Sequence, residues 1–113
     1  MPALVTVIIK PYLLDEVKSA LRAAGVTGLT VSEVQGFGRQ GGKTETFRGT
    51  EYRVEFIPKV RVEVVVPLAE AEQTLKIVTD AARTGKIGDG KAWITVVERL
   101  MRIRTGEMGE DAV

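Results

Sequence analysis

The segment Gly36-Phe-Gly-Arg-Gln-Gly-Gly-Lys-Thr-Glu-Thr-Phe-Arg-Gly-Thr-Glu-Tyr52 separates two apolar, β-branched runs and contains five glycines. Glycine-dense backbone loses much entropy on ordering and accepts positive φ, which predicts a mobile loop. Loops longer than about 12–15 residues are uncommon in small domains and are usually functional or disordered. We therefore expect the rest of the chain to be a scaffold that holds this loop out and controls its shape.

The residues before this loop predict a strand, a helix and a second strand. Residues 4–9 are mostly Val and Ile, which is typical of a buried strand, and Pro11 ends the run. A helix closed by Gly25 follows, with apolar residues at spacings of three and four: Leu14, Val17, Leu21 and Ala24. Polar and apolar residues then alternate over residues 30–34, as in a strand with one face inward.

The residues after the loop repeat this order. Alternation resumes over residues 52–56, is expected to break at Pro58-Lys59, and continues as a third strand over residues 60–66 with Arg61 and Glu63 on its solvent face. Pro67 fits the first position of a second helix, which Gly85 would close. The apolar face of that helix would be Leu68, Ala71, Leu75, Val78 and Ala82. A fourth strand is predicted over residues 92–97, and residues 101–104 predict a short extended segment.

The order β-α-β-β-α-β predicts an α+β fold, a ferredoxin-like sandwich with a long protruding loop. Two helices on one side of four strands leave the other sheet face bare. Because Val and Ile dominate the strands, we expect that face to be covered by other copies of the chain.

Composition excludes several classes of function. The 113-residue chain carries 16 basic and 15 acidic residues, a formal net charge of +1, which argues against a general nucleic-acid or membrane-surface binder. It contains neither cysteine nor histidine, so disulfides, thiolate metal sites and the commonest general base are excluded. The N-terminal apolar run is too short for a membrane span, so we expect a cytoplasmic protein without membrane insertion.

A second glycine-rich stretch, Thr84-Gly-Lys-Ile-Gly-Asp-Gly-Lys91, nearly satisfies the P-loop signature. However, Ala92 stands where the Mg²⁺-binding Ser or Thr should be, and the loop follows a helix and enters a strand. Backbone N–H groups and a lysine can still bind phosphate, although a plain helix end and turn explain the stretch equally well. Arg102 and Arg104, two apart in the predicted extended segment, would point to one side and could bind phosphate, or form a solvated strand face.

Two further patterns have weaker interpretations. Gly36-Phe-Gly occurs in the RNA-recognition module, which has the same fold, but few aromatic side chains are present to stack on bases. Tyr52 lies where the strand pattern resumes, two residues after Thr50. Its side chain is expected either to pack half-buried at the start of the strand or to expose a hydroxyl group that can be modified.

Seven ordered segments make the chain resemble the PII nitrogen-signalling family along nearly its whole length. They are Ile8-Ile-Lys-Pro11, Gly25-Val-Thr-Gly-Leu-Thr-Val31, Gly36-Phe-Gly-Arg-Gln40, Arg48-Gly-Thr-Glu-Tyr52, Pro58-Lys-Val60, Thr84-Gly-Lys-Ile-Gly-Asp-Gly-Lys91 and Arg102-Ile-Arg-Thr-Gly-Glu107. The resemblance implies a single domain over residues 1–113 that forms a homotrimer with three inter-subunit clefts. It also implies a mobile loop at about 37–55, a phosphate-binding loop at about 83–91 and a C-terminal loop at about 102–110.

In this family each cleft binds ATP or ADP, and Mg²⁺–ATP recruits 2-oxoglutarate. By resemblance the nucleotide would contact Thr30, Gly36, Phe37, Gly38, Arg39, Glu63, Val65, Gly88, Asp89, Gly90, Lys91, Arg102 and Arg104. The segment Gly88–Lys91 would cradle the phosphates, the two arginines would clamp them from the adjacent subunit, and the strand residues would lie by adenine and ribose. The 2-oxoglutarate residues would be Gly38, Gln40, Gly41, Lys59 and Gly88, with Gln40 also ligating Mg²⁺.

General chemistry agrees with these implied ligands. A triphosphate repels a dianion unless a divalent cation lies between them, so the two ligands should bind synergistically.

Ordering a residue costs about 1–2 kcal/mol, so effectors are expected to fix only residues 36–41 and Lys59 and to leave the loop tip to order on a partner.

The resemblance makes Tyr52 the acceptor for uridylylation or adenylylation, with Thr50 in the place of a phosphorylated serine of some relatives. Implied partners are an ammonium transporter, a nucleotidylyltransferase or metabolic enzymes. Lys43 and Phe47 depart from the family pattern, which puts partner identity in doubt. We expect a non-enzymatic regulator without catalytic residues; the alternatives are a slow ATPase and a ferredoxin-like RNA-binding module.

Overall fold

The computed structural model describes residues 1–37 and 56–113 of the chain. Its strands are β1 (Pro2–Ile9), β2 (Thr30–Gly36), β3 (Ile57–Pro67) and β4 (Ala92–Val96). Its α-helices are α1 (Leu14–Ala23) and α2 (Ala71–Ala82), each preceded by one 3₁₀ turn, at Pro11–Leu13 and Leu68–Glu70. The expected order β-α-β-β-α-β is therefore confirmed. The long loop predicted between the halves falls on residues outside the described ranges.

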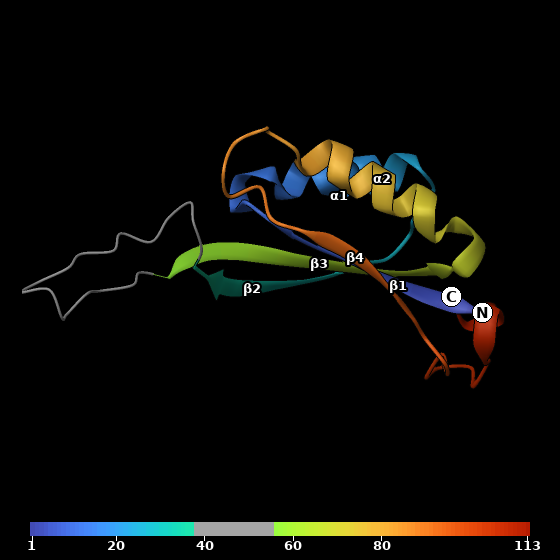
Figure 1. Ribbon diagram of the computed structural model, residues 1–113. Helices are drawn as coiled ribbons and strands as arrows, with labels where there is room; N and C mark the ends of the chain where they lie inside the picture. The colour runs from blue at the N-terminus through green and yellow to red at the C-terminus, as the bar shows by residue number, and fades with distance from the viewer. Residues whose placement is uncertain (38–55) are drawn as a thin grey trace, which may run out of the picture.

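The four strands form one antiparallel sheet in the order β2-β3-β1-β4. Both α-helices lie on the same face of this sheet, and in the described ranges no α-helix lies on the opposite face, which we call the uncovered face (Figure 1). This is the ferredoxin-like arrangement that the sequence predicted. The first and last residues both lie at one end of the sheet, whereas the connection from α2 to β4 lies at the other end (Figure 1).

The core lies between the helices and one face of the two central strands. Antiparallel register places directly paired residues on the same face, and the pairs Val5–Val64, Val7–Val62 and Ile9–Val60 are all buried. Val17 and Leu21 of α1 and Val78 of α2 close over them, each at most 1% exposed. The alternation in β1 and β3 therefore determines which face the helices cover.

The uncovered sheet face is chemically mixed, in agreement with the charged solvent face that is predicted for the third strand. The valines of β3 at positions 60, 62, 64 and 66 are all buried in the core. The opposite face carries Arg61 and Glu63, with Thr6 and Ile8 paired to them across β1. It also carries Leu4, Val65 and the exposed Trp93. The face therefore combines apolar and charged groups.

Gly25 ends α1 as predicted. Its φ is +93°, and its N–H donates to the Arg22 carbonyl at 3.0 Å while the Val26 N–H donates to the Leu21 carbonyl at 3.0 Å. This pair of hydrogen bonds is a Schellman motif, which favours glycine at the left-handed position.

Three predictions about the second half are wrong in detail. Pro58 does not break the strand, because β3 pairs with β2 through this residue. The pairing of β3 with β1 covers only Val60 to Pro67, so the missing N–H group of Pro58 removes no hydrogen bond to β1. Pro67 is the last residue of β3, and the 3₁₀ turn after it leaves Leu68 40% exposed. The helix α2 ends at Ala82, since Arg83 is already extended, so Gly85 shapes the following loop and does not cap the helix.

Candidate functional site

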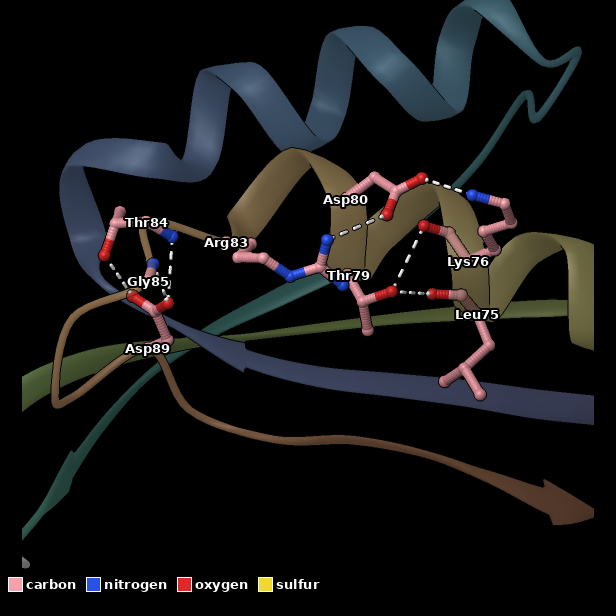
Figure 2. Close-up of polar contacts among 8 residues, drawn as sticks. All are labelled: Leu75, Lys76, Thr79, Asp80, Arg83, Thr84, Gly85 and Asp89. Carbon is pink, nitrogen blue, oxygen red and sulfur yellow. Dashed lines mark hydrogen bonds and ion pairs between the residues drawn. The ribbon is translucent and has the colours of Figure 1, made fainter.

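The loop between α2 and β4 is organised by the carboxylate of Asp89. The main-chain N–H groups of Thr84 and Gly85 each donate to its Oδ2 at 2.8 Å, and the Thr84 hydroxyl donates to its Oδ1 (Figure 2). Lys10 forms an ion pair with the same carboxylate at 3.2 Å. One side chain thus joins the beginning of the loop to its end.

These contacts keep Asp89 ionised. The Thr84 hydroxyl, the N–H groups of Thr84 and Gly85, and Lys10 hold the pKa of Asp89 well below its usual range. Burial opposes this effect without reversing it. Because the carboxylate faces groups of its own loop and Lys10, Asp89 supports the loop, and its neighbours Gly88, Gly90 and Lys91 remain the candidates for contact with phosphate.

The exit of the loop is attached to β1. The Ile8 N–H donates to the Lys91 carbonyl at 2.9 Å. Gly90, with φ of +92°, packs so closely that a Cβ atom there would lie 1.9 Å from the Ile8 carbonyl oxygen. Only glycine satisfies both the backbone angle and the contact. Neither Ile8 nor Lys10 was a candidate site residue; the signal for both was their presence in the segment Ile8-Ile-Lys-Pro11.

A hollow of about 660 Å³ opens beside this loop on the uncovered sheet face. Its lining consists of Ile8, Gly36, Phe37, Lys59, Trp93 and the loop residues Lys86 to Lys91. Three lysines and one aspartate line it, and that aspartate is already paired with Lys10. The excess positive charge favours an anionic ligand.

Lys59 lies at the inner wall of this hollow. Its side chain comes from β3, only 8% of the residue is exposed, and Nζ donates to the Gly88 carbonyl at 2.6 Å. Burial lowers the pKa of Lys59, repulsion from Lys10 lowers it further, and the charge of Asp89 opposes both. An ammonium group has three N–H donors, so Lys59 can bind a further acceptor while it holds Gly88.

The structure places the predicted nucleotide residues that it describes in three parts of the molecule. The hollow just described contains Gly36, Phe37, Gly88, Asp89, Gly90 and Lys91, together with Lys59, which the resemblance assigns to 2-oxoglutarate. A second hollow, of about 520 Å³, contains Thr30, Glu63 and Val65 and is closed by the C-terminal residues Leu100, Ala112 and Val113. Thr6 donates a hydrogen bond to Glu63 at 3.3 Å and so supports that carboxylate from β1.

Arg102 and Arg104 belong to the C-terminal segment, which lies at the end of the sheet opposite to the loop between α2 and β4 (Figure 1). Arg102 donates to Glu107 at 3.1 Å and to the Val113 main-chain oxygen at 2.9 Å. The prediction of an extended segment over residues 101–104 is wrong. Ile103 to Thr105 form a turn, in which the Gly106 N–H donates to the Arg102 carbonyl. One copy of the chain therefore keeps its arginines apart from Lys91.

Several sequence predictions lie outside the described residues and stay predictions: Gly38, Arg39, Gln40, Gly41, Thr50 and Tyr52. Within residues 1–37 and 56–113, no group of three or more acidic side chains is placed to hold a metal ion. In the same ranges, every helix is too short or too polar to cross a membrane.

Comparison with known proteins gives a consistent result. Residues 3–107 match the family model described as Nitrogen regulatory protein P-II. A relative of that name from Cereibacter sphaeroides is 59% identical over 106 residues, covering 94% of this chain and 95% of the relative. Relatives with the same name from Rhodobacter capsulatus and Azospirillum brasilense are 56% and 55% identical, covering 96% and 94% of this chain and 97% and 95% of their own lengths.

Proposed function

The chain belongs to the nitrogen regulatory protein P-II family and is a nitrogen signal-transduction regulator of that type, and from this premise we propose that it senses ATP or ADP together with 2-oxoglutarate. The observation that carries the proposal is that the loop between α2 and β4 and the C-terminal segment, which contains Arg102, lie at opposite ends of the sheet (Figure 1). A site with its halves so far apart is completed most simply by a neighbouring copy.

The proposed assembly is a homotrimer with one nucleotide in each cleft between subunits. One subunit supplies Lys91 and the loop glycines for the phosphates. The next subunit supplies Arg102 and Arg104, together with the hollow formed by Thr30, Glu63 and Val65 for adenine and ribose. This division is supported by the two hollows, because the second hollow is closed by the same C-terminal segment that carries the arginines.

The second proposed effector, 2-oxoglutarate, would bind beside Lys59. Its distal carboxylate suits an ammonium group that already holds the Gly88 carbonyl and has further N–H donors. Gln40, Gly38 and Gly41 complete this proposed site and lie in residues that the structure does not describe. Mg²⁺, when bound, would bridge the keto acid and the triphosphate and so offset their repulsion.

The output of the proposed sensor is a change in partner binding through residues 37–55. As a regulator of this family the chain acts through target proteins, and an ammonium transporter, a nucleotidylyltransferase or metabolic enzymes are the proposed classes. Tyr52 is the proposed acceptor of a nucleotidyl group, with Thr50 as a second candidate. We assign no catalytic residue and expect the protein to act in the cytoplasm.

Isothermal calorimetry tests the order of binding. We expect 2-oxoglutarate to bind only when Mg²⁺–ATP is present, and ADP to compete with ATP without supporting 2-oxoglutarate binding. Binding of 2-oxoglutarate in the absence of nucleotide would contradict the bridging role of the metal. Sustained ATP turnover in the same samples would instead favour the alternative of a slow ATPase.

A further inference from the structure

Lys10 links the end of β1 to both ends of the phosphate-binding loop. Its Nζ lies 3.2 Å from Asp89 Oδ1 and donates to the Thr84 hydroxyl at 3.2 Å, while two residues earlier Ile8 contacts Gly90 and Lys91. The side chain of Lys10 is only 18% exposed, so solvent weakens the ion pair less than it would on an open surface. The segment from Ile8 to Lys10 therefore acts as the support against which the loop folds.

The backbone of Lys10 is itself held in place. It follows the last residue of β1 and precedes Pro11, and its φ of −66° and ψ of 136° are those that a following proline favours. The Lys10 carbonyl accepts the Leu13 N–H at 3.0 Å, which joins it to the turn before α1. The Lys10 side chain therefore extends toward Asp89 from a backbone position that is already held in place.

The proposed function creates a need for this cation. A carboxylate within a loop that binds phosphate would repel the ligand, yet Asp89 is the group that holds Thr84 and Gly85 together. A positive charge on the side of Asp89 away from the ligand would remove the repulsion and keep the loop closed (Figure 2 shows the contacts of Asp89 with Thr84 and Gly85).

Resting on the proposed function, we propose that Lys10 is a positioning residue for nucleotide binding. It neutralises Asp89 and ties the loop to β1, so that affinity for the nucleotide depends on Lys10 without any contact between them. This role differs from that of Lys91, whose ammonium group would meet the phosphates directly.

Calorimetry with Mg²⁺–ATP on four single variants and one double variant tests the proposal. Lys10→Met should lower affinity by roughly tenfold or more, as for the loss of a group that orients a ligand-binding residue. Lys10→Arg, which keeps the charge and the reach, should stay within about threefold of the unchanged protein. Lys76→Met should bind as the unchanged protein does, because the Lys76–Asp80 ion pair (2.8 Å) lies on the exposed side of α2 (Figure 2).

The fourth variant, Asp89→Asn, shows whether Lys10 acts through Asp89. In that background Lys10→Met should change affinity by less than about threefold, since the charge to be neutralised is gone. An equal loss in both backgrounds would mean that Lys10 touches the nucleotide, and an unchanged affinity of Lys10→Met would mean that it has no role; either result overturns the proposal.

Amide hydrogen exchange without nucleotide gives an independent measurement. Lys10→Met should speed exchange at Thr84 and Gly85, whose N–H groups are held by Asp89, and leave exchange in α1 unchanged. If the unchanged protein failed to bind Mg²⁺–ATP, the proposed function would be wrong, whereas exchange would still decide whether Lys10 holds the loop. Unaltered exchange at both amides would show that it does not.

Discussion

The carboxylate of Asp89 and the missing side chain of Gly90 determine the shape of the loop between α2 and β4. The Asp89 carboxylate accepts hydrogen bonds from two N–H groups and a hydroxyl group and pairs with an ammonium group. The absence of a Cβ atom at Gly90 lets the backbone contact Ile8. Both residues belong to the expected phosphate-binding segment, and the contacts of both are with other parts of the same chain. What they contribute is a backbone shape in which Gly88 and Lys91 can meet an anion.

Gly90→Ala should destabilise the protein by roughly 2–5 kcal/mol, because a Cβ atom would both strain a positive φ and overlap the Ile8 carbonyl. Urea denaturation measures the free energy of unfolding. Gly85→Ala is the matched control: its φ is +84° but a Cβ atom there meets nothing within 4 Å, so the loss should be roughly 1–2 kcal/mol. Equal losses of unfolding free energy in the two variants would show that the backbone at Ile8 moves to accommodate the added Cβ atom at little cost.

At the scale of elements, β3 connects the two ends of the molecule. It pairs with β1 from Val60 to Pro67 and with β2 from Ile57 to Glu63. The same strand therefore carries Lys59 to the loop between α2 and β4, and Glu63 and Val65 to the second hollow. Because β3 continues through Pro58, Lys59, Glu63 and Val65 lie on one strand and on the same, uncovered face of the sheet.

The pairing of β2 with β3 ends in an aromatic contact. Beyond the last pair, Gly36 with Ile57, the rings of Phe37 and Phe56 meet edge to face, with centroids 5.5 Å apart. These two residues flank the segment from 38 to 55. The contact would help to hold the start and the end of that segment together, which the proposed output requires.

A double-mutant cycle of Phe37→Ala and Phe56→Ala should give a coupling energy of about 0.5–1.5 kcal/mol, near the lower value because the residues are 62% and 58% exposed. Thermal or urea unfolding supplies the four free energies. Tyr12→Ala removes a 71% exposed aromatic residue elsewhere and should change stability by less than about 0.5 kcal/mol. Additive effects of the two phenylalanines would mean that the rings do not interact in solution.

At the scale of the whole molecule, the proposed function gives each chain two different half-sites. The loop between α2 and β4 lies at one end of the sheet and the C-terminal segment at the other (Figure 1), and each of them borders one of the two hollows. In a closed ring of identical copies, the loop between α2 and β4 of each copy meets the C-terminal segment of the next copy, so every proposed half-site is paired. The uncovered sheet face, with its mixture of Leu4, Ile8, Trp93, Arg61 and Glu63, is the surface that we expect the assembly to bury.

Mixing two inactive variants tests this arrangement. Lys91→Ala and Arg102→Ala should each lose roughly 2–5 kcal/mol of nucleotide affinity, as for one partner of a desolvated charge pair. Co-expressed chains should regain part of the Mg²⁺–ATP-dependent binding of 2-oxoglutarate, because some clefts then combine an intact Lys91 with an intact Arg102. Calorimetry on the mixed oligomers measures the recovered fraction of sites.

The control mixture pairs Lys91→Ala with Lys59→Ala. Both residues lie in the same half-site, so every cleft lacks one of them and no 2-oxoglutarate binding should return. Recovery in the control, or none in the test mixture, would contradict a site shared between subunits.

The amino-acid sequence alone determined the order of the elements, the solvent face of β3 with Arg61 and Glu63, and the family, because hydrophobic periodicity and short motifs depend on neighbours in the chain. It also identified Lys59, Gly88, Gly90 and Lys91 as candidates for one site. Only the tertiary structure decided that Asp89 is neutralised by Lys10, that β3 continues through Pro58, and that the C-terminal segment with Arg102 lies at the opposite end of the sheet from the loop between α2 and β4. These features depend on contacts between distant segments, where strand register and through-space charge act, and local sequence patterns carry no record of either.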